Sequence, residues 1–179
     1  MSTIKTEIPT KEQLLNESVT GVIKQLKDHP EEAEATFKVR SKLKEGFLSR
    51  IEARDFKLLS DEPEELGGSN LGPNPVEYVL AALAACQEIV IKAHAGQLGI
   101  DVRTVRVEAE GDIDLRGFFN VSDDVRAGFN KVTYHTVIET DETDTDKLKK
   151  LKQLSLNRCP VLDIIENPVA VDGTVSYLN

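Results

Sequence analysis

The sequence predicts an α+β fold with an antiparallel sheet and a buried central helix, on the basis of three observations. Polar and apolar residues alternate over 34–61, 102–115 and 130–140, which is typical of strands. Helical patterns lie before, between and after these strands, an order that indicates the α+β class. The helix that contains "YVLAALAAC" is apolar nearly all round, so we expect it to be buried in the core.

The first helical pattern predicts an amphipathic helix with a defined start and end. Thr10 and Gln13 can form a capping box, and Pro30 stops the helix. One face of this helix is apolar: Leu15, Val19, Val22 and Leu26. We expect residues 1–32 to form a helical extension and residues 33–179 to form a single domain.

Three residues mark the start of the central helix. Asn74 is a good N-cap, Pro75 suits the first helical position, and Glu77 stands where the acid of a capping box belongs. The preceding loop, "DEPEELGGSNLGPNP", is too rich in Gly and Pro to form a regular element. We expect the helix to end near Leu98.

The remaining elements follow from local pattern. Gly46 marks the turn between the first two strands, and the strands at 102–115 and 130–140 are expected to be antiparallel neighbours. Residues 143–158 form an amphipathic pattern, with acids at its start and cations later, which predicts a helix. A last strand is expected at 168–178.

The composition excludes several classes of function. Hydrophobic residues make up 40% and charged residues 30%, as in a soluble globular protein, and the net charge is −9. Such a charge repels phosphate backbones and anionic membranes, so we expect neither nucleic acid nor membrane as a partner. No apolar run is long enough to span a bilayer, and the N-terminus lacks the pattern of a signal peptide, so a cytoplasmic location is expected.

The two cysteines allow an inert and a reactive interpretation. A free cysteine often does no more than pack, and Cys86 lies in an Ala- and Leu-rich helix. Cys159 precedes Pro160 and could stand at the N-terminus of a short helix, where the helix dipole lowers the pKa of a thiol. Local physics alone therefore selects Cys159 as the nucleophile.

Other chemistries find little support in the motifs. The sequence has no CxxC or HExxH and its three histidines are far apart, so no metal is expected. No GK[ST] follows the glycine loop, which argues against a phosphate loop. A thiol hydrolase needs a histidine base, and His94 lies about two helical turns from Cys86. No cofactor is expected.

Two stretches together resemble the OsmC/Ohr family of osmotically inducible and organic hydroperoxide resistance proteins. They are "SDEPEELGGSNLGPNPVEYVLAALAAC", which ends at Cys86, and "CPVLDIIENPVAV", which begins at Cys159. The resemblance runs from about Phe37 to the C-terminus. It implies an OsmC-like fold that assembles as an intertwined homodimer, with active sites at the subunit interface.

The resemblance also implies a thiol peroxidase that reduces organic hydroperoxides in oxidative or osmotic stress defence. In this scheme Cys86 attacks the peroxide and Cys159 resolves the sulfenic acid as a disulfide, which reverses the local ranking. A dithiol, either a small molecule or a lipoyl-type group, then reduces the disulfide back to two thiols by exchange. Phe118 and Phe119 are candidates for the wall of an apolar substrate pocket.

A glutamate and an arginine complete the site that the resemblance implies. The glutamate directly follows the Asn-Pro pair in the family, where this chain has Val76. Glu77 and, as an alternative, Glu88 could substitute for it. Arg40 is the first candidate to activate the thiolate and Arg54 the second.

Two rival interpretations stay open. The same dimer could bind a hydrophobic small molecule and have little peroxidase activity, or the thiols could be purely structural. The peroxidase interpretation requires Cys86 and Cys159 to lie close enough to form a bridge, with Cα atoms within about 7 Å.

Overall fold

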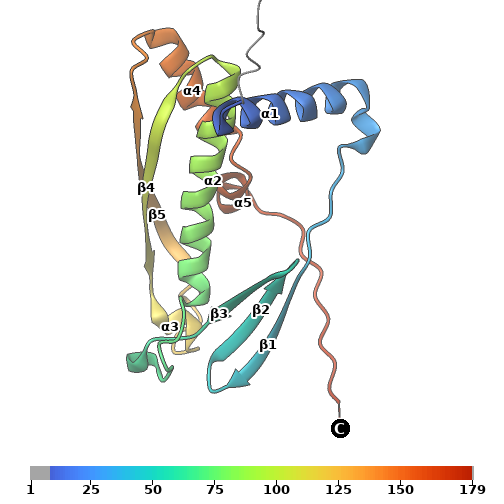
Figure 1. Ribbon diagram of the computed structural model, residues 1–179. Helices are drawn as coiled ribbons and strands as arrows, with labels where there is room; N and C mark the ends of the chain where they lie inside the picture. Colours follow the sequence, from blue (N-terminus) through green and yellow to red (C-terminus); the bar gives the residue numbers. More distant parts are fainter. Residues whose placement is uncertain (1–8, 179) are drawn as a thin grey trace, which may run out of the picture.

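A computed structural model describes residues 9–178. A long antiparallel hairpin is covered on one face by three helices, and a small separate sheet lies beyond one end of the central helix (Figure 1). The elements, in chain order, are α1 Lys11–Asp28, the 3-10 turn η1 Pro30–Glu32, β1 Val39–Glu45, β2 Leu48–Ala53, β3 Phe56–Ser60, η2 Glu64–Leu66, α2 Pro75–Gln97, β4 Val102–Ile113, α3 Leu115–Phe118, β5 Phe129–Thr140, α4 Thr145–Asn157 and α5 Pro160–Glu166.

The central helix α2 begins as the sequence predicts. The Glu77 N–H donates to Asn74 Oδ1 at 2.9 Å, and the Asn74 N–H donates to Glu77 Oε2 at 2.8 Å, which forms the expected capping box. The helix ends at Gln97 with Leu98 as its C-cap, as predicted. Within residues 9–178, no helix combines the length and the apolar character needed to cross a bilayer.

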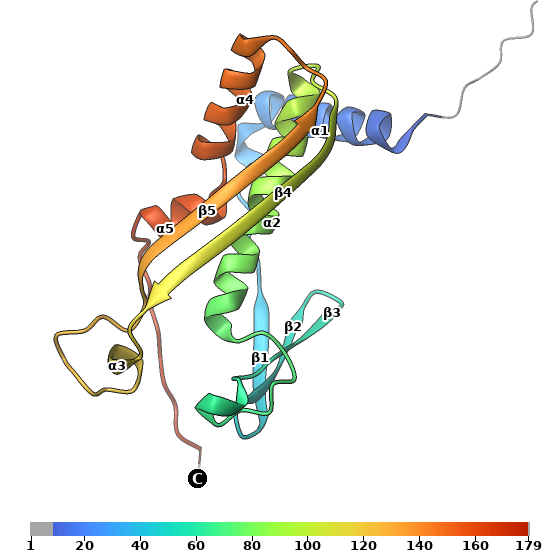
Figure 2. The same ribbon diagram turned by 90° about the vertical axis from the view of Figure 1, so that its left-hand side faces the viewer.

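Two apolar clusters fix α2 against the hairpin β4–β5 and the C-terminal helices. The first comprises Ile91, Ala95, Ile100, Val102 and Leu151. The second comprises Leu83, Val90, Cys159 and Leu162. Figure 2 shows the hairpin in front of α2, with α4 and α5 on the same side of the sheet as α2. The core therefore lies between the hairpin and these helices, and one of the two cysteines is part of it.

The sheets differ in two respects from the prediction. Strands β1, β2 and β3 form one antiparallel sheet in that order, while β4 and β5 pair only with each other, so the described chain has two sheets. The prediction of a strand at 168–178 was wrong. This segment leaves α5 and joins neither sheet (Figure 2). A strand needs a neighbour for its backbone hydrogen bonds, and in the single chain this segment has none. Its apolar residues are exposed, Val171 to 83%.

Helix α1 packs by a face other than the one that its pattern favours. Its capping box is confirmed, with the Gln13 N–H donating to Thr10 Oγ1 at 3.2 Å. It crosses the C-terminal part of α2, where Glu12 pairs with Lys92 at 2.7 Å. A side chain on Gly96 of α2 would collide with Asn16, so glycine permits this close crossing. The apolar residues Leu15, Val22 and Leu26 stay exposed, and the division into an extension and a domain remains a prediction.

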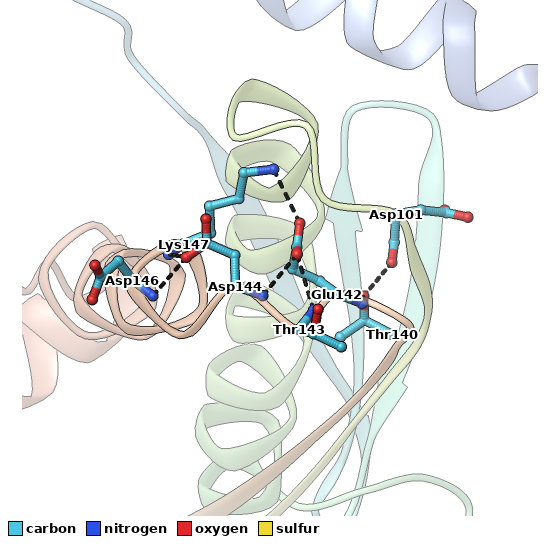
Figure 3. A network of polar contacts seen from close by, with 7 residues as sticks. All are labelled: Asp101, Thr140, Glu142, Thr143, Asp144, Asp146 and Lys147. Carbon is cyan, nitrogen blue, oxygen red and sulfur yellow. Dashed lines mark hydrogen bonds and ion pairs between the residues drawn. The ribbon is translucent and has the colours of Figure 1, made fainter.

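The corner between β5 and α4 is held by the Glu142 carboxylate (Figure 3). This carboxylate accepts two backbone N–H groups, one of them from Asp144, each at 2.9 Å, and pairs with Lys147 at 3.0 Å. These contacts lower the pKa of Glu142. The largest effect comes from the Asp144 N–H, and the next largest comes from Lys147. Asp144 itself caps α4. The corner directs α4 back along α2 and so sets the position of the segment that carries Cys159.

Candidate active site

The fold brings the two cysteines into contact. Cys86, on α2, packs against the cluster that contains Cys159, the residue that precedes α5. The two side chains are close enough for Cys159 to influence the pKa of Cys86, and neither thiol is in a disulfide. Cys159 is 2% exposed, whereas Cys86 is half-buried. A half-buried thiol thus has a buried thiol beside it.

Cys159 is the N-cap of α5, as the sequence predicts. Pro160 occupies the first helical position, and the Leu162 N–H donates to Cys159 Sγ at 3.4 Å. The sulfur is therefore held in one place by the start of the helix, facing α2.

The described surroundings of Cys86 raise the pKa of its thiol. Burial raises the pKa of this thiol, and the hydrogen bond with Cys159 raises it further. The Val161 N–H acts in the opposite direction but does not outweigh these effects. Because the thiolate is the nucleophile, a raised pKa disfavours attack on a peroxide, and no cation of residues 9–178 is among the groups that lower it.

Glu77 is placed as a helix cap and faces away from Cys86. Its carboxylate is bonded to the Asn74 N–H. It lies nine positions before Cys86, which is about 180° around the helix and about 13 Å along it. Glu88 is exposed and lies two positions beyond Cys86, also on a different side of α2.

The two candidate arginines both belong to the small sheet. Arg40 is in β1, opposite Glu52 of β2. Arg54 forms the turn between β2 and β3 with a left-handed backbone (φ 55°), and its guanidinium lies 5.0 Å from the ring centre of Phe56. Neither is among the groups that shift the pKa of Cys86. Within the described chain, the predicted cysteines come together but the predicted arginines do not join them.

Phe118 and Phe119 line an apolar cavity at the start of α2. Their rings meet edge to face with centres 4.8 Å apart. The cavity has a volume of about 250 Å³, and its other apolar walls are Leu43, Phe47, Leu66 and Pro75. Cys86 is not part of its lining, so this cavity and the chain's own thiol pair are separate.

Two residues near the thiols escaped the sequence analysis. Tyr134 of β5 packs against the Cys159 cluster, and burial, followed by the charges of Glu166 and Cys159, raises its pKa. Its inward position in the alternating pattern of 130–140 was the available signal. Gln87 is 1% exposed and donates to the Ser155 carbonyl at 3.2 Å, which ties α2 to α4. No local pattern indicates that partner.

The glycine loop before α2 is organised by Asp61. This carboxylate is 2% exposed and accepts the N–H groups of Glu62, Ser69 and Leu71 at 2.9, 3.1 and 3.3 Å. A Cβ atom at Gly68 would overlap the Glu62 carbonyl, so glycine is required there. The "GGSN" motif is therefore explained as a tight loop around one buried acid.

We expect Asp61→Ala to lower the free energy of unfolding by about 3 kcal/mol, because three backbone N–H groups of the loop lose their acceptor. In a chain of this size this corresponds to a fall in Tm of about 10 °C, measurable by calorimetry. The matched control is Asp124→Ala, since Asp124 lies exposed in the β4–β5 connection. Equal Tm values for the two variants would contradict this role of Asp61.

One face of α2 is left uncovered. Along it lie Val79, Ala82, Ala85 and Ile89, all exposed, and Ile89 is 68% exposed. The sequence predicts that α2 is buried on all sides. In the single chain only the face toward the hairpin is buried. Cys86 lies at the edge of the open face.

No metal cluster is evident in residues 9–178, where no three His, Cys, Asp or Glu side chains gather as ligands.

Comparisons with known proteins agree with the fold. The sequence model of the OsmC-like protein family matches residues 67–173, more than half of the chain. A search of curated proteins gives no match. Among solved structures, an OsmC-like protein from Mycoplasma pneumoniae has a TM-score of 0.64 at 18% identity, with 75% of this chain and 90% of that chain covered. An OsmC-like protein of unknown function from Vibrio cholerae has a TM-score of 0.62 at 15% identity, covering 74% and 95%.

A third solved structure carries a more specific description. It is an organic hydroperoxide resistance protein OsmC from Legionella pneumophila, also described as a predicted redox protein, with a TM-score of 0.54 at 23% identity. It covers 75% of this chain and 91% of its own. At these identities the three structures establish a shared fold.

Proposed function

Because this chain belongs to the OsmC-like protein family, we propose that it is a thiol peroxidase that reduces organic hydroperoxides through Cys86 and Cys159. The observation that carries the proposal is the contact between the two thiols, which comes from residues far apart in the sequence. The description of the Legionella pneumophila relative as an organic hydroperoxide resistance protein supports the choice of substrate class.

The reaction proceeds in three balanced steps. The Cys86 thiolate attacks one peroxide oxygen, so that an S–O bond forms, the O–O bond breaks and an alcohol leaves with a proton. The Cys159 thiol then attacks the sulfur of the Cys86 sulfenic acid, which forms the disulfide and releases water. A dithiol, small-molecule or lipoyl-type, reduces this disulfide by exchange and is itself oxidised. Two cysteines are too few for a disulfide scaffold and fit a reducing compartment, so we place the protein in the cytoplasm.

We further propose that the working form is a homodimer. Two apolar surfaces are uncovered: the open face of α2 and the side of the small sheet that carries Val39, Leu43, Phe56 and Leu58. Surfaces of this kind are covered in obligate dimers. A second copy that brings its small sheet to α2 would bury both.

The dimer also supplies the missing positive charge in this proposal. An arginine from the partner's small sheet would stabilise the Cys86 thiolate and lower its raised pKa. Of the two candidates Arg54 is better placed, because it stacks on Phe56 of the apolar side. Arg40 lies on the opposite side of the sheet, together with Lys42. The cavity wall formed by Phe118 and Phe119 is separate from Cys86 in the single chain, so it would contact the organic part of the substrate only across the proposed dimer.

A second candidate function is the binding of a hydrophobic small molecule. The raised pKa of Cys86 and the use of Glu77 as a cap favour it, because both leave the thiol unactivated in the chain. In that case the thiol pair would be incidental, and the protein would bind an apolar ligand without turnover.

Thiol loss after addition of less than one equivalent of peroxide separates these functions. We expect cumene or tert-butyl hydroperoxide to consume two thiols per peroxide. Both should react faster than hydrogen peroxide, because Cys86 packs against the apolar cluster of Leu83, Val90 and Leu162. No thiol loss with either organic peroxide would exclude the peroxidase and favour the binding function.

A further inference from the structure

The side of the small sheet opposite its apolar side carries a concentration of positive charge. Residues that stand opposite each other on neighbouring strands share a face of the sheet. On this face Arg40 stands opposite Glu52, Lys42 opposite Arg50, and Glu52 opposite Lys57. All of these side chains are exposed. The sheet that carries them is the one formed by β1, β2 and β3 in Figure 1. We call this surface the cationic sheet face.

The central pair of this face is unfavourable for the sheet itself. Lys42 and Arg50 stand directly opposite each other on β1 and β2. Like charges in directly opposed positions destabilise an antiparallel pair. Within residues 9–178, none of the cations of this face forms an ion pair, so no carboxylate directly contacts Lys42 or Arg50 in the described chain.

A cavity of about 330 Å³ lies over this pair. Four cations and one acid line it: Arg40, Lys42, Lys44 and Arg50, with Glu52. Its size is that of a small-molecule site rather than of a macromolecular groove. Alternate residues of one strand are about 7 Å apart and opposed residues about 5 Å, so the cations surround a volume that one compact anion can fill.

We propose that the cationic sheet face binds a small polyanion, a compound with two or more neighbouring phosphate groups. Such a ligand can accept charge-assisted hydrogen bonds from Lys42 and Arg50 at the same time and so remove their mutual repulsion. The net charge of −9 disfavours a long nucleic acid on this protein. This face also lacks an aromatic platform for bases, because Phe56 lies on the other side of the sheet.

Binding of inorganic triphosphate, measured by calorimetric titration on the full chain, tests the proposal. We expect millimolar or tighter binding of triphosphate, and binding of single phosphate about tenfold or more weaker. The variant Lys42→Gln/Arg50→Gln should bind triphosphate about tenfold or more weakly. The matched control is Lys150→Gln/Lys152→Gln, which removes the same charge from the exposed side of α4 and should bind as the parent protein does.

Thermal unfolding without ligand gives a second readout. The double variant of the sheet should have a Tm equal to or above that of the parent, because the opposed cations are gone, while triphosphate should no longer raise it. Equal loss of binding in the α4 control would overturn the proposal, as would no binding of triphosphate. Binding of an oligonucleotide or a poly-glutamate chain that triphosphate does not displace would also overturn it.

Discussion

Replacement of Cys86 by Ser is expected to abolish consumption of organic hydroperoxide. The hydroxyl of serine is not ionised near neutral pH and is a far weaker nucleophile toward the O–O bond than a thiolate. The fold should survive, because Cys86 is half-buried and serine is of similar size. Peroxide disappearance, followed with excess dithiol, should fall to the rate without protein, and the Tm should stay close to that of the parent.

Cys159→Ser should separate the two cysteine roles. This variant should react with one equivalent of peroxide and stop, because the sulfenic acid on Cys86 has no thiol to condense with. A dimedone-type probe should then label Cys86, as mass spectrometry of the digested protein can show. An adduct on Cys159 in the Cys86→Ser protein would instead favour the helix-terminus argument. No adduct in either variant would favour the binding function.

The pH dependence of that single reaction tests the source of positive charge. A raised pKa of Cys86 means that the thiolate fraction, and with it the rate, grows as the pH rises through an elevated pKa. A partner's arginine would shift this rise to lower pH. We expect Arg54→Gln in the Cys159→Ser background to move the rise back to higher pH, and Arg40→Gln to leave it in place. The opposite ranking would assign the role to Arg40.

The parts of the fold that local chemistry determines could be predicted from the sequence. The start of α2 follows from three neighbouring residues, Asn74, Pro75 and Glu77. The alternation of polar and apolar residues over 130–140 is sufficient to predict β5. The N-cap position of Cys159 follows in the same way from the proline after it. The encounter of two distant thiols does not follow from local chemistry, and only the resemblance to a family implied it.

The parts that depend on distant or missing partners could not be predicted. Residues 168–178 have the pattern of a strand but no neighbour in the single chain. Helix α1 meets α2 through Asn16 and Gly96, although its periodicity favours its apolar face. The pattern of β1 and β2 predicts two faces but does not say which one would turn toward α2 of another copy in the proposed dimer. The register places Arg40 on the charged side of the sheet, whereas Arg54 stacks on Phe56 of the apolar side, and the sequence does not show this difference.

Replacement of Ile89 by Glu should break the proposed homodimer. Ile89 is the most exposed large apolar residue of α2, and a second copy that covers this face would bury it. A carboxylate buried there without a partner costs several kcal/mol, enough to dissociate a dimer at micromolar concentration. We expect the parent protein to sediment at twice the chain mass of 19.8 kDa and the variant to sediment as single chains.

Leu156→Glu is the matched control, since Leu156 is an exposed apolar residue of α4. It should remain dimeric, which would show that one added charge is not sufficient to separate the chains. The Ile89→Glu protein should also lose peroxidase activity while both cysteines stay intact, because the activating arginine would leave with the partner. A parent protein that sediments as a monomer at micromolar concentration would contradict the shared site. A monomeric Ile89→Glu protein with full activity would show that the chain activates Cys86 by itself.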